Sequence, residues 1–547
     1  MKTNPPSRNA SYRQLGLALL VGILLGVSFP KPGLSWLAWI APGWLLWLAG
    51  AYGGRNALRI GFYGGLGFNL TALHWLLFIP IPLNAILGWL SVSCILALFM
   101  SAWCWGCWRI LTGLTGNHST DSIETLARVS IARRLLWFTV CATFWVTTEM
   151  IIARLFTGFP WNLLGVSQFE FIPLIQISSF TSVYGVSFVV AWISVSLVFT
   201  GMLLWKKRLQ TRAAFQQIAV PVSVLLVLLG FGFAKMNRTS PPDKVLSLAL
   251  IQPSFPQPLI WDPNEKTNRF NGLLELSRRA LASKPDILVW PETSLPDFFT
   301  RHNAIAIQEI TAMAKAHNVW MVLGANDTRV RETNGVREVD LFNSAFLVNP
   351  AGELANRYHK RRLVMFGEYM PMRDWFPFLK QFRGSGGGLT PGVRDVPFEL
   401  GAQRAKAAVL ICFEDVFPHF ARLSVSAETD FLLNLTNDGW FGQGSAQWQH
   451  AAIAVFRAVE NGIPLVRCTN NGLTCWVDSN GRMHEVYFDG SQDVHQAGFK
   501  FARLPLKTEA KRQLTFYTRL GDLFGWSCVV FTAMLLALFG FRKPAAR

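Results

Sequence analysis

The sequence predicts a polytopic α-helical membrane domain joined to an α/β domain. Of its 547 residues, 51% are hydrophobic, only 15% are charged and 22 are tryptophans, a composition typical of membrane proteins. Apolar residues dominate 12–234 and 522–541, whereas 243–519 has the mixed composition of a soluble domain. We therefore expect a membrane domain in residues 1–240, an α/β domain in residues 241–519, and a C-terminal transmembrane helix with its tail in residues 520–547.

Eight segments are apolar over a length that can cross a bilayer, which takes about 20 helical residues for about 30 Å of hydrocarbon. They are 13–29, 34–51, 57–79, 84–108, 134–154, 180–204, 215–234 and 520–541. The first could instead be the apolar core of a signal peptide. However, the stretch from Val27 to Pro30 has no small-x-small cleavage site, and further spans follow at once. We expect seven spans before the α/β domain and one after it.

The positive charges predict the orientation of these spans. If the N-terminus is cytoplasmic, the inner segments are rich in Lys and Arg, as in the run Lys206-Lys207-Arg208. The short outer loops carry little beyond Lys31 and Arg154, which follows the positive-inside rule. Seven spans then place the α/β domain on the outer side. The same residues account for much of the net charge of +18, so no nucleic-acid partner is needed to explain it.

Strand-like and helix-like patterns alternate through the second domain, which predicts sheets covered by helices. The strand-like runs are 245–251, 286–290, 319–324, 341–348, 407–411, 430–436 and 463–469, and the helical patterns are 264–283, 301–317 and 446–461. The stretch Asn470-Asn471-Gly472 predicts a two-residue hairpin, which would oppose Cys468 and Cys475 at a distance that a disulfide accepts. Nothing in the sequence requires so short a loop to be closed, and we expect a free buried pair rather than a disulfide.

Chemically reactive side chains follow two of these segments, and a third lies in a basic stretch. Glu292 comes after the apolar run 286–290, Lys360 lies among arginines with Glu368 eight residues on, and Cys412 ends the run 407–411. Each has an ordinary structural explanation when taken singly. A carboxylate after a strand is often a turn residue, a lysine among arginines is often a solvated face, and a lone cysteine is often a small core residue.

Taken together, Glu292, Lys360 and Cys412 form a coherent catalytic set. A carboxylate held in apolar surroundings can take a thiol proton near neutral pH. A neighbouring ammonium favours the thiolate and can neutralise an oxyanion. The cysteine can then form a thioester, which splits one acyl transfer into two easier steps. The sequence therefore predicts acyl-transfer chemistry.

Several motifs resemble those of the nitrilase (carbon-nitrogen hydrolase) superfamily and, with the surrounding spans, the apolipoprotein N-acyltransferases of the bacterial inner membrane. They are WPE at 290–292, LVMFGEYMP at 363–371, CFE at 412–414, NLTNDGWFG at 434–442 and WQH at 448–450. The resemblance implies a nitrilase-like α-β-β-α sandwich. It also implies Glu292 as base, Lys360 as oxyanion stabiliser and Cys412 as nucleophile, with Glu368 and Glu414 as supporting acids.

The implied reaction moves an acyl chain from a membrane phospholipid to Cys412 and then to the α-amino group of the S-diacylglyceryl cysteine of an apolipoprotein. The implied location is the bacterial inner membrane, with the catalytic domain on the periplasmic side. No cofactor is implied. The nine histidines lack ligand spacing, so we expect no metal, and we interpret His450 as structural.

Aromatic residues complete the expected site. The position after the nucleophile is often tyrosine in this family and is Phe413 here, so a phenol hydroxyl is absent while the backbone N–H still can donate. Trp261, Trp440 and Phe441 are candidates to line the entrance for an acyl chain, since aromatics suit a lipid interface. Their alternative is an ordinary place in the core.

Two other classes of protein stay open on the sequence. A membrane-tethered nitrilase-like amidase would use the same three residues with water as the acceptor, although a small soluble amide needs no membrane anchor. A transporter would need charged or broken spans along a path, and Glu149 is the main central charge in the spans.

Overall fold

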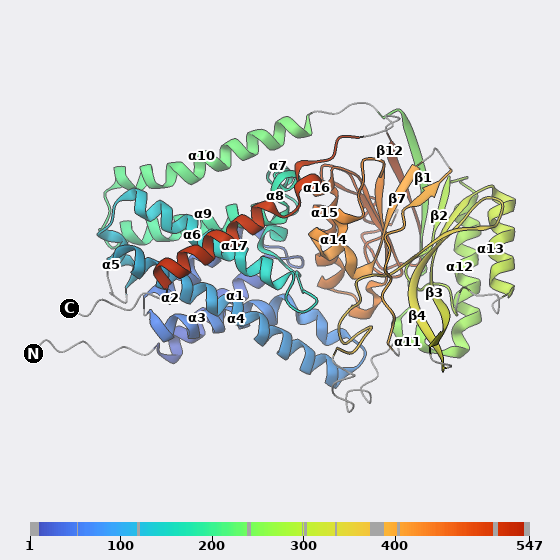
Figure 1. The fold of residues 1–547 in the computed structure, drawn as a ribbon, viewed down its shortest axis with the longest axis horizontal. Coiled ribbons are helices and arrows are strands. Elements are labelled where there is room, and N and C mark those ends of the chain that lie inside the picture. Colours follow the sequence, from blue (N-terminus) through green and yellow to red (C-terminus); the bar gives the residue numbers. More distant parts are fainter. Residues whose placement is uncertain are drawn as a thin grey trace, which may run out of the picture. The chain divides into compact units, whose positions relative to one another are not determined.

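Two units make up the chain, one helical and one built on two β-sheets (Figure 1). The computed structural model describes residues 10–51, 53–116, 121–237, 242–297, 299, 304–333, 336–371, 388–401, 405–488, 490–506 and 512–540. The helical unit comprises Met1–Arg238 with Leu520–Arg547, and the second unit comprises Thr239–Arg519. The second unit is thus inserted between helices of the first.

Four helices of the first unit are long and apolar enough to cross a membrane, within the part of the chain that the structure describes. They are α4 (Pro82–Thr115), α6 (Ile131–Ile152), α9 (Val183–Trp205) and α10 (Thr211–Met236). They coincide with the predicted spans 84–108, 134–154, 180–204 and 215–234. At about 1.5 Å per residue, each is long enough for the hydrocarbon core of a bilayer.

The other four predicted spans correspond to shorter or more polar helices. They are α1 (Tyr12–Gly26), α2 (Ala41–Gly50), α3 (Gly54–Ala72) and α17 (Leu523–Leu535). A 15-residue helix such as α1 extends only about 22 Å, less than one full span. The helix α3 is long enough but contains Arg55, Arg59 and two asparagines. Helix length and hydropathy therefore support four of the eight predicted spans.

The surface of α10 shows what surrounds this unit. Phe215, Leu226 and Val227 are each more than 60% exposed, although a helix of this composition would not be stable with that face in water. Lipid chains suit such a face, and a helix pairs most of its backbone groups internally. The four apolar helices and the uncovered apolar face of α10 are those of a membrane protein.

The second unit contains two six-stranded sheets with the same plan. In the first sheet the order is β12-β1-β2-β3-β4-β5, and in the second it is β11-β10-β9-β8-β7-β6. Three strands at the centre of each sheet run parallel and the flanking strands are antiparallel. The strands are β1 (Lys244–Gln252), β2 (Ile287–Val289), β3 (Trp320–Thr333), β4 (Val336–Val348), β5 (Leu354–His359), β6 (Phe398–Leu400), β7 (Ala405–Ile411), β8 (Phe431–Thr436), β9 (Leu465–Thr469), β10 (Cys475–Val477), β11 (Met483–His484) and β12 (Gly498–Leu506).

The two sheets pack face to face with helices outside. Because side chains alternate along a strand, Leu246, Leu248 and Leu250 of β1 join a core with residues of both sheets, while Ala249 and Ile251 face the other way. That outer side is covered by α12 (Lys266–Leu281) and α13 (Ala304–His317). The helices α14 (Pro418–Leu423) and α15 (Ser445–Asn461) lie beside the second sheet (Figure 1). The predicted α-β-β-α sandwich and membrane domain are confirmed.

The predicted hairpin register, in which Cys468 lies directly opposite Cys475, is wrong. In the structure Cys475 pairs with Arg467, one residue away from the predicted partner, because the connecting loop is not a two-residue turn. A shift of one residue moves a side chain to the opposite face of a strand. The thiol of Cys468 points between the sheets, toward the carbonyl oxygens of Ile251 and Val289, and Cys475 packs in a separate cluster. Both cysteines are free thiols.

Candidate active site

The reactive residues gather where strands of both sheets end. Glu292 follows β2, Lys360 directly follows β5, and Cys412 directly follows β7. The strand β5 is antiparallel to β4, which is antiparallel to β3, so β5 runs in the same direction as β2. The carboxyl ends of strands with one direction meet at one edge of a sheet, which is the usual place for ligands in α/β proteins.

The Glu292 carboxylate is buried and accepts hydrogen bonds from three donors. Its Oε1 accepts from Asn343 Nδ2 at 2.7 Å and from Lys360 Nζ at 3.2 Å. Its Oε2 accepts from the backbone N–H of Asn437 at 2.9 Å. The expectation of apolar surroundings for this carboxylate is therefore wrong, since strand ends supply polar donors. These bonds hold the carboxylate in one orientation.

The Lys360 ammonium lies between two carboxylates. It is 1% exposed and donates to Glu368 Oε1 at 2.8 Å as well as to Glu292. Burial opposes its charge, but the Glu292 and Glu368 carboxylates outweigh burial and raise the pKa of Lys360 well above its usual range. Asn343 also donates to Glu368, at 3.4 Å. Lys360 is thus a fixed cation at this edge.

Cys412 sits on a sharply turned backbone. Its φ is +52°, a left-handed conformation that is uncommon for residues other than glycine and is found at functional turns. The residue is the first of the short helix η7 (Cys412–Val416), and its side chain is partly exposed. Its carbonyl oxygen accepts a hydrogen bond from Asn434 Nδ2 at 3.0 Å. The backbone leaves the direction of β7 at this turn.

The surroundings of Cys412 keep its thiol protonated at rest. Burial raises the pKa of this thiol most, and the Glu292 carboxylate raises it further. The Lys360 ammonium and a hydrogen bond with the Thr436 side chain lower it, but the pKa stays well above the ordinary value for cysteine. A nearby group must therefore remove the proton when the thiol reacts, and Glu292 is a carboxylate close enough to influence the thiol.

Glu414 holds the backbone around the site rather than contacting Lys360. Its carboxylate is fully buried and accepts from four donors: the Tyr358 hydroxyl and the backbone N–H groups of Ile411, Arg361 and Arg362, all within 2.7–3.0 Å. Burial raises the pKa of Glu414, and these backbone donors partly offset it. This carboxylate joins the end of β7 to the segment that carries Lys360.

The aromatic candidates occupy two places. The ring of Trp261, at the end of α11 (Gln257–Trp261), meets the ring of Trp440 edge to face with centroids 5.3 Å apart. Trp261 is 39% exposed. Trp440 and Phe441 belong to the short helix η8 (Asp438–Phe441) and are partly exposed. Phe413 packs edge to face on Phe417, with centroids 5.1 Å apart.

Four buried charged side chains form a network next to the turn that carries Cys412: Asp415, Asp438, His450 and Arg467. His450 Nδ1 is 2.8 Å from Asp438 Oδ1, and its Nε2 is 2.7 Å from Asp415 Oδ1. Arg467 donates to the second oxygen of each carboxylate, at 2.6 Å for Asp415 and 3.2 Å for Asp438. All four side chains are at most 2% exposed.

The sequence reasoning missed this network, together with Asn343 and Asn437. Two signals pointed to it. Arg467 stands within an otherwise apolar strand, and a buried charge must be paired. The other signal is the polar run at the end of the predicted strand 430–436, in which Thr436, Asn437 and Asp438 are consecutive.

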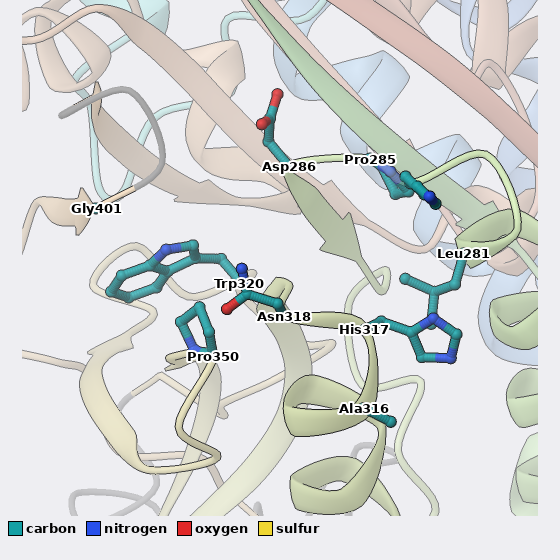
Figure 2. A pocket seen from close by; sticks show the side chains of 10 residues that line it. Leu281, Pro285, Asp286, Ala316, His317, Asn318, Trp320, Pro350 and Gly401 are labelled. Carbon is teal, nitrogen blue, oxygen red and sulfur yellow. The ribbon is translucent and has the colours of Figure 1, made fainter.

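A separate cavity of about 540 Å³ lies at the other edge of the first sheet (Figure 2). Asp286, which lines it, precedes β2, whereas Glu292 follows that strand. Trp320, at the start of β3, lines the same cavity. The cavity is therefore distinct from the edge that carries the reactive residues. No group of three or more potential metal ligands occurs among the described residues.

The chain is similar to proteins of two described families. Residues 247–499 match the carbon-nitrogen hydrolase family, and residues 21–196 match the apolipoprotein N-acyltransferase N-terminal domain. The apolipoprotein N-acyltransferase of Geobacter metallireducens is 34% identical, covering 96% of this chain and 95% of the relative. That of Rickettsia prowazekii is 28% identical, with 86% and 89% covered. An amidase of the nitrilase superfamily from Nesterenkonia aligns with 51% of this chain and 95% of its own, at 17% identity and a TM-score of 0.36.

The fold and the matched regions define an enzyme of the carbon-nitrogen hydrolase class joined to a membrane domain. The chain belongs to the apolipoprotein N-acyltransferase family, since the match to a relative of that name extends over nearly the whole of both chains.

Proposed function

We propose that this protein N-acylates apolipoproteins, taking the acyl chain from a membrane phospholipid through a thioester on Cys412. The single observation that carries the proposal is the contact of Lys360 with both Glu292 and Glu368 at the strand edge where Cys412 turns outward. A carboxylate, an ammonium and a thiol that lie close together in a chain with membrane helices support this proposal.

In the first half-reaction, Glu292 takes the proton of the Cys412 thiol as the sulfur attacks the ester carbonyl carbon of the phospholipid. The Lys360 ammonium and the backbone N–H of Phe413 stabilise the oxyanion that forms. The intermediate collapses by breaking the bond to the glycerol oxygen. That oxygen receives the proton from Glu292, and a lysophospholipid leaves while the acyl chain stays on sulfur as a thioester.

In the second half-reaction, the α-amino group of the S-diacylglyceryl cysteine attacks the thioester carbonyl. Glu292 accepts a proton from the amine, and the carbon–sulfur bond breaks to give an amide. The proton returns to the departing sulfur, so the enzyme ends in its starting state. Trp261, Trp440 and Phe441 suit the walls of an acyl-chain entrance because two of their rings pack together and all three are partly exposed.

The proposed activity can be tested with purified protein, a phospholipid labelled in its acyl chain and a synthetic diacylglyceryl-cysteine peptide. We expect labelled N-acyl peptide and lysophospholipid in equal amounts, measured by mass spectrometry. An amidase would instead release free acid from small amides and leave the peptide unmodified. That second result, without peptide acylation, would contradict the proposal.

We further propose that the catalytic unit faces the periplasm from the bacterial inner membrane. The helix α9 ends at Trp205 and α10 begins at Thr211, and the turn between them contains Lys206, Lys207 and Arg208. Basic turns stay cytoplasmic. The 26-residue α10 is long enough for one crossing, and it leads directly into the unit that starts at Thr239.

This orientation predicts opposite labelling of two single-cysteine tags in whole cells. Gln210→Cys, in the basic turn, should react with a membrane-impermeant maleimide only after the membrane is opened. Val339→Cys, on an exposed part of β4, should react once the outer membrane is permeabilised. The unchanged protein measures the background from its native thiols. Labelling of both tags from the same side would remove the orientation argument and, with it, the periplasmic acceptor.

A further inference from the structure

Three consecutive residues at the end of β8 connect the reactive groups of the site. The Thr436 hydroxyl donates to Asp438 Oδ1 at 3.2 Å, and it lies close enough to the Cys412 thiol to lower the pKa of that thiol. The backbone N–H of Asn437 donates to Glu292 Oε2. The Asp438 carboxylate accepts from His450 and Arg467. Whatever fixes Asp438 therefore fixes the neighbours of both the thiol and the carboxylate.

The same histidine also holds the turn of the nucleophile. His450 Nε2 meets Asp415, which is three residues after Cys412 in η7. With a carboxylate facing each ring nitrogen, only the imidazolium form can donate on both sides. Its charge balances the network, since two carboxylates then face two cations, whereas a neutral ring would leave one buried negative charge in excess.

We propose that His450 is a positioning residue that acts as an imidazolium clamp, holding the Cys412 turn and the Thr436–Asp438 segment together and keeping an excess negative charge away from the thiol. It acts through Asp415 and Asp438 rather than on the reacting atoms. The proposal rests on the proposed acyl transfer for its consequence on the reaction, but it also predicts a property of the thiol that needs no substrate.

The other charged groups around His450 support this assignment. Burial opposes a charge on the ring, and so does Arg467 on β9, but Asp415 and Asp438 outweigh them and raise the pKa of His450 to about 9. Arg457, on the same helix, is paired with Glu460. Because the pKa is raised on folding, the contribution of His450 is full below pH 6.5 and is lost as the pH rises through about 9.

The test compares wild-type protein with His450→Gln over pH 6.5–10.5, measuring the rate at which iodoacetamide alkylates Cys412 by mass spectrometry of its peptide. Below pH 8 we expect the variant to react on the order of 10-fold more slowly, because an uncompensated negative charge suppresses the thiolate. Above pH 10 the two rates should converge, because the wild-type ring has then lost its proton. Glu292, Lys360 and Arg467 are present in both proteins and cancel in the ratio.

A merely structural role would lower the rate by the same factor at every pH, and that result, or equal rates throughout, would overturn the proposal. The matched control is His484→Gln, which changes a partly exposed histidine of β11 paired with Asp478 and should behave as wild type. If His450→Gln does not fold, the double variant His450→Gln/Asp438→Asn restores the charge balance and should recover both folding and the neutral-pH rate. Failure of this double variant to regain either would equally count against the clamp.

Alkylation also separates this inference from the proposed function. The measured quantity is the alkylation rate of the wild type divided by that of His450→Gln. If wild-type protein forms no acyl-enzyme with phospholipid while this ratio still falls with rising pH, the clamp stands and the acyl-transfer proposal fails. If acyl-enzyme forms but the ratio is independent of pH, the acyl-transfer proposal stands and the clamp fails.

Discussion

Cys412→Ala should abolish acyl transfer while leaving the protein folded and inserted in the membrane. Alanine fills the turn at φ +52° with a side chain smaller than cysteine but offers no atom that can hold the acyl chain. The loss should be complete in an assay that follows labelled phospholipid into a diacylglyceryl-cysteine peptide. A thermal unfolding curve close to that of the wild type would show that only the chemistry was removed.

The control for this variant is Cys94→Ala, which removes an exposed cysteine of α4 and should transfer acyl chains at the wild-type rate. If Cys412→Ala also transfers at the wild-type rate, the covalent mechanism is wrong. The proposed roles of Glu292 and Lys360 would then lose their basis, because both are argued from the thiol.

Glu292→Gln should slow formation of the acyl-enzyme by about 10²–10⁴, the usual contribution of a general base. The amide has the same shape, and its one oxygen can still accept from Lys360, but it loses the acceptor for the N–H of Asn437 and cannot take the thiol proton. The rate should be followed as single-turnover accumulation of acyl-enzyme without acceptor.

The rate for Glu292→Gln should also recover toward the wild-type value as the pH is raised. Hydroxide then removes the proton that the base no longer accepts, and the raised pKa of Cys412 leaves a large thiol fraction to be converted. Glu309→Gln changes an exposed carboxylate paired with Arg278 and should be indistinguishable from wild type. A single-turnover rate for Glu292→Gln within a factor of two of the wild type at neutral pH would exclude this residue as the base.

The sequence predicted the strands that carry the site because apolar runs bounded by polar residues are a local signal. All seven predicted strands and all three predicted helices of the second unit are present. The strands that were missed are short or lie toward the edges of the sheets, such as β6 and β10. Edge strands alternate less clearly because one side of each is not covered by a neighbouring strand.

The contacts within the site were less predictable than its members. Glu292 and Cys412 could be selected because each follows a buried run, and Lys360 because its segment resembles a family motif, and the structure brings the three together. The polar surroundings of Glu292 could not be predicted, because they depend on Asn343 and Asn437 from distant parts of the chain. The prediction of the strand register at Cys475 failed for a similar reason. The loop before Cys475 is held by contacts outside the hairpin, such as the hydrogen bond from Asn470 to the carbonyl oxygen of Phe255.

The membrane helices show the same limit. Composition alone identified α4, α6, α9 and α10, whose apolar runs are long and continuous. The segments 34–51 and 57–79 are apolar on average. In the structure, however, the first is divided into a 3₁₀ turn and α2, and the second is divided into most of α3 and a further 3₁₀ turn. Such breaks depend on packing within the unit, including the close approach of α1 to α3 at Gly22 and Gly64, which average hydropathy does not report.

The most direct test of the account is mass spectrometry of the Cys412 peptide after wild-type protein is incubated with phospholipid and no acceptor. We expect this peptide to gain the mass of one acyl chain in place of a hydrogen, and hydroxylamine to remove it, as it does a thioester. Addition of a diacylglyceryl-cysteine peptide should discharge the adduct and yield the N-acyl product. An unmodified Cys412 in protein that transfers acyl chains, or an acyl group on a different residue, would contradict the central claim.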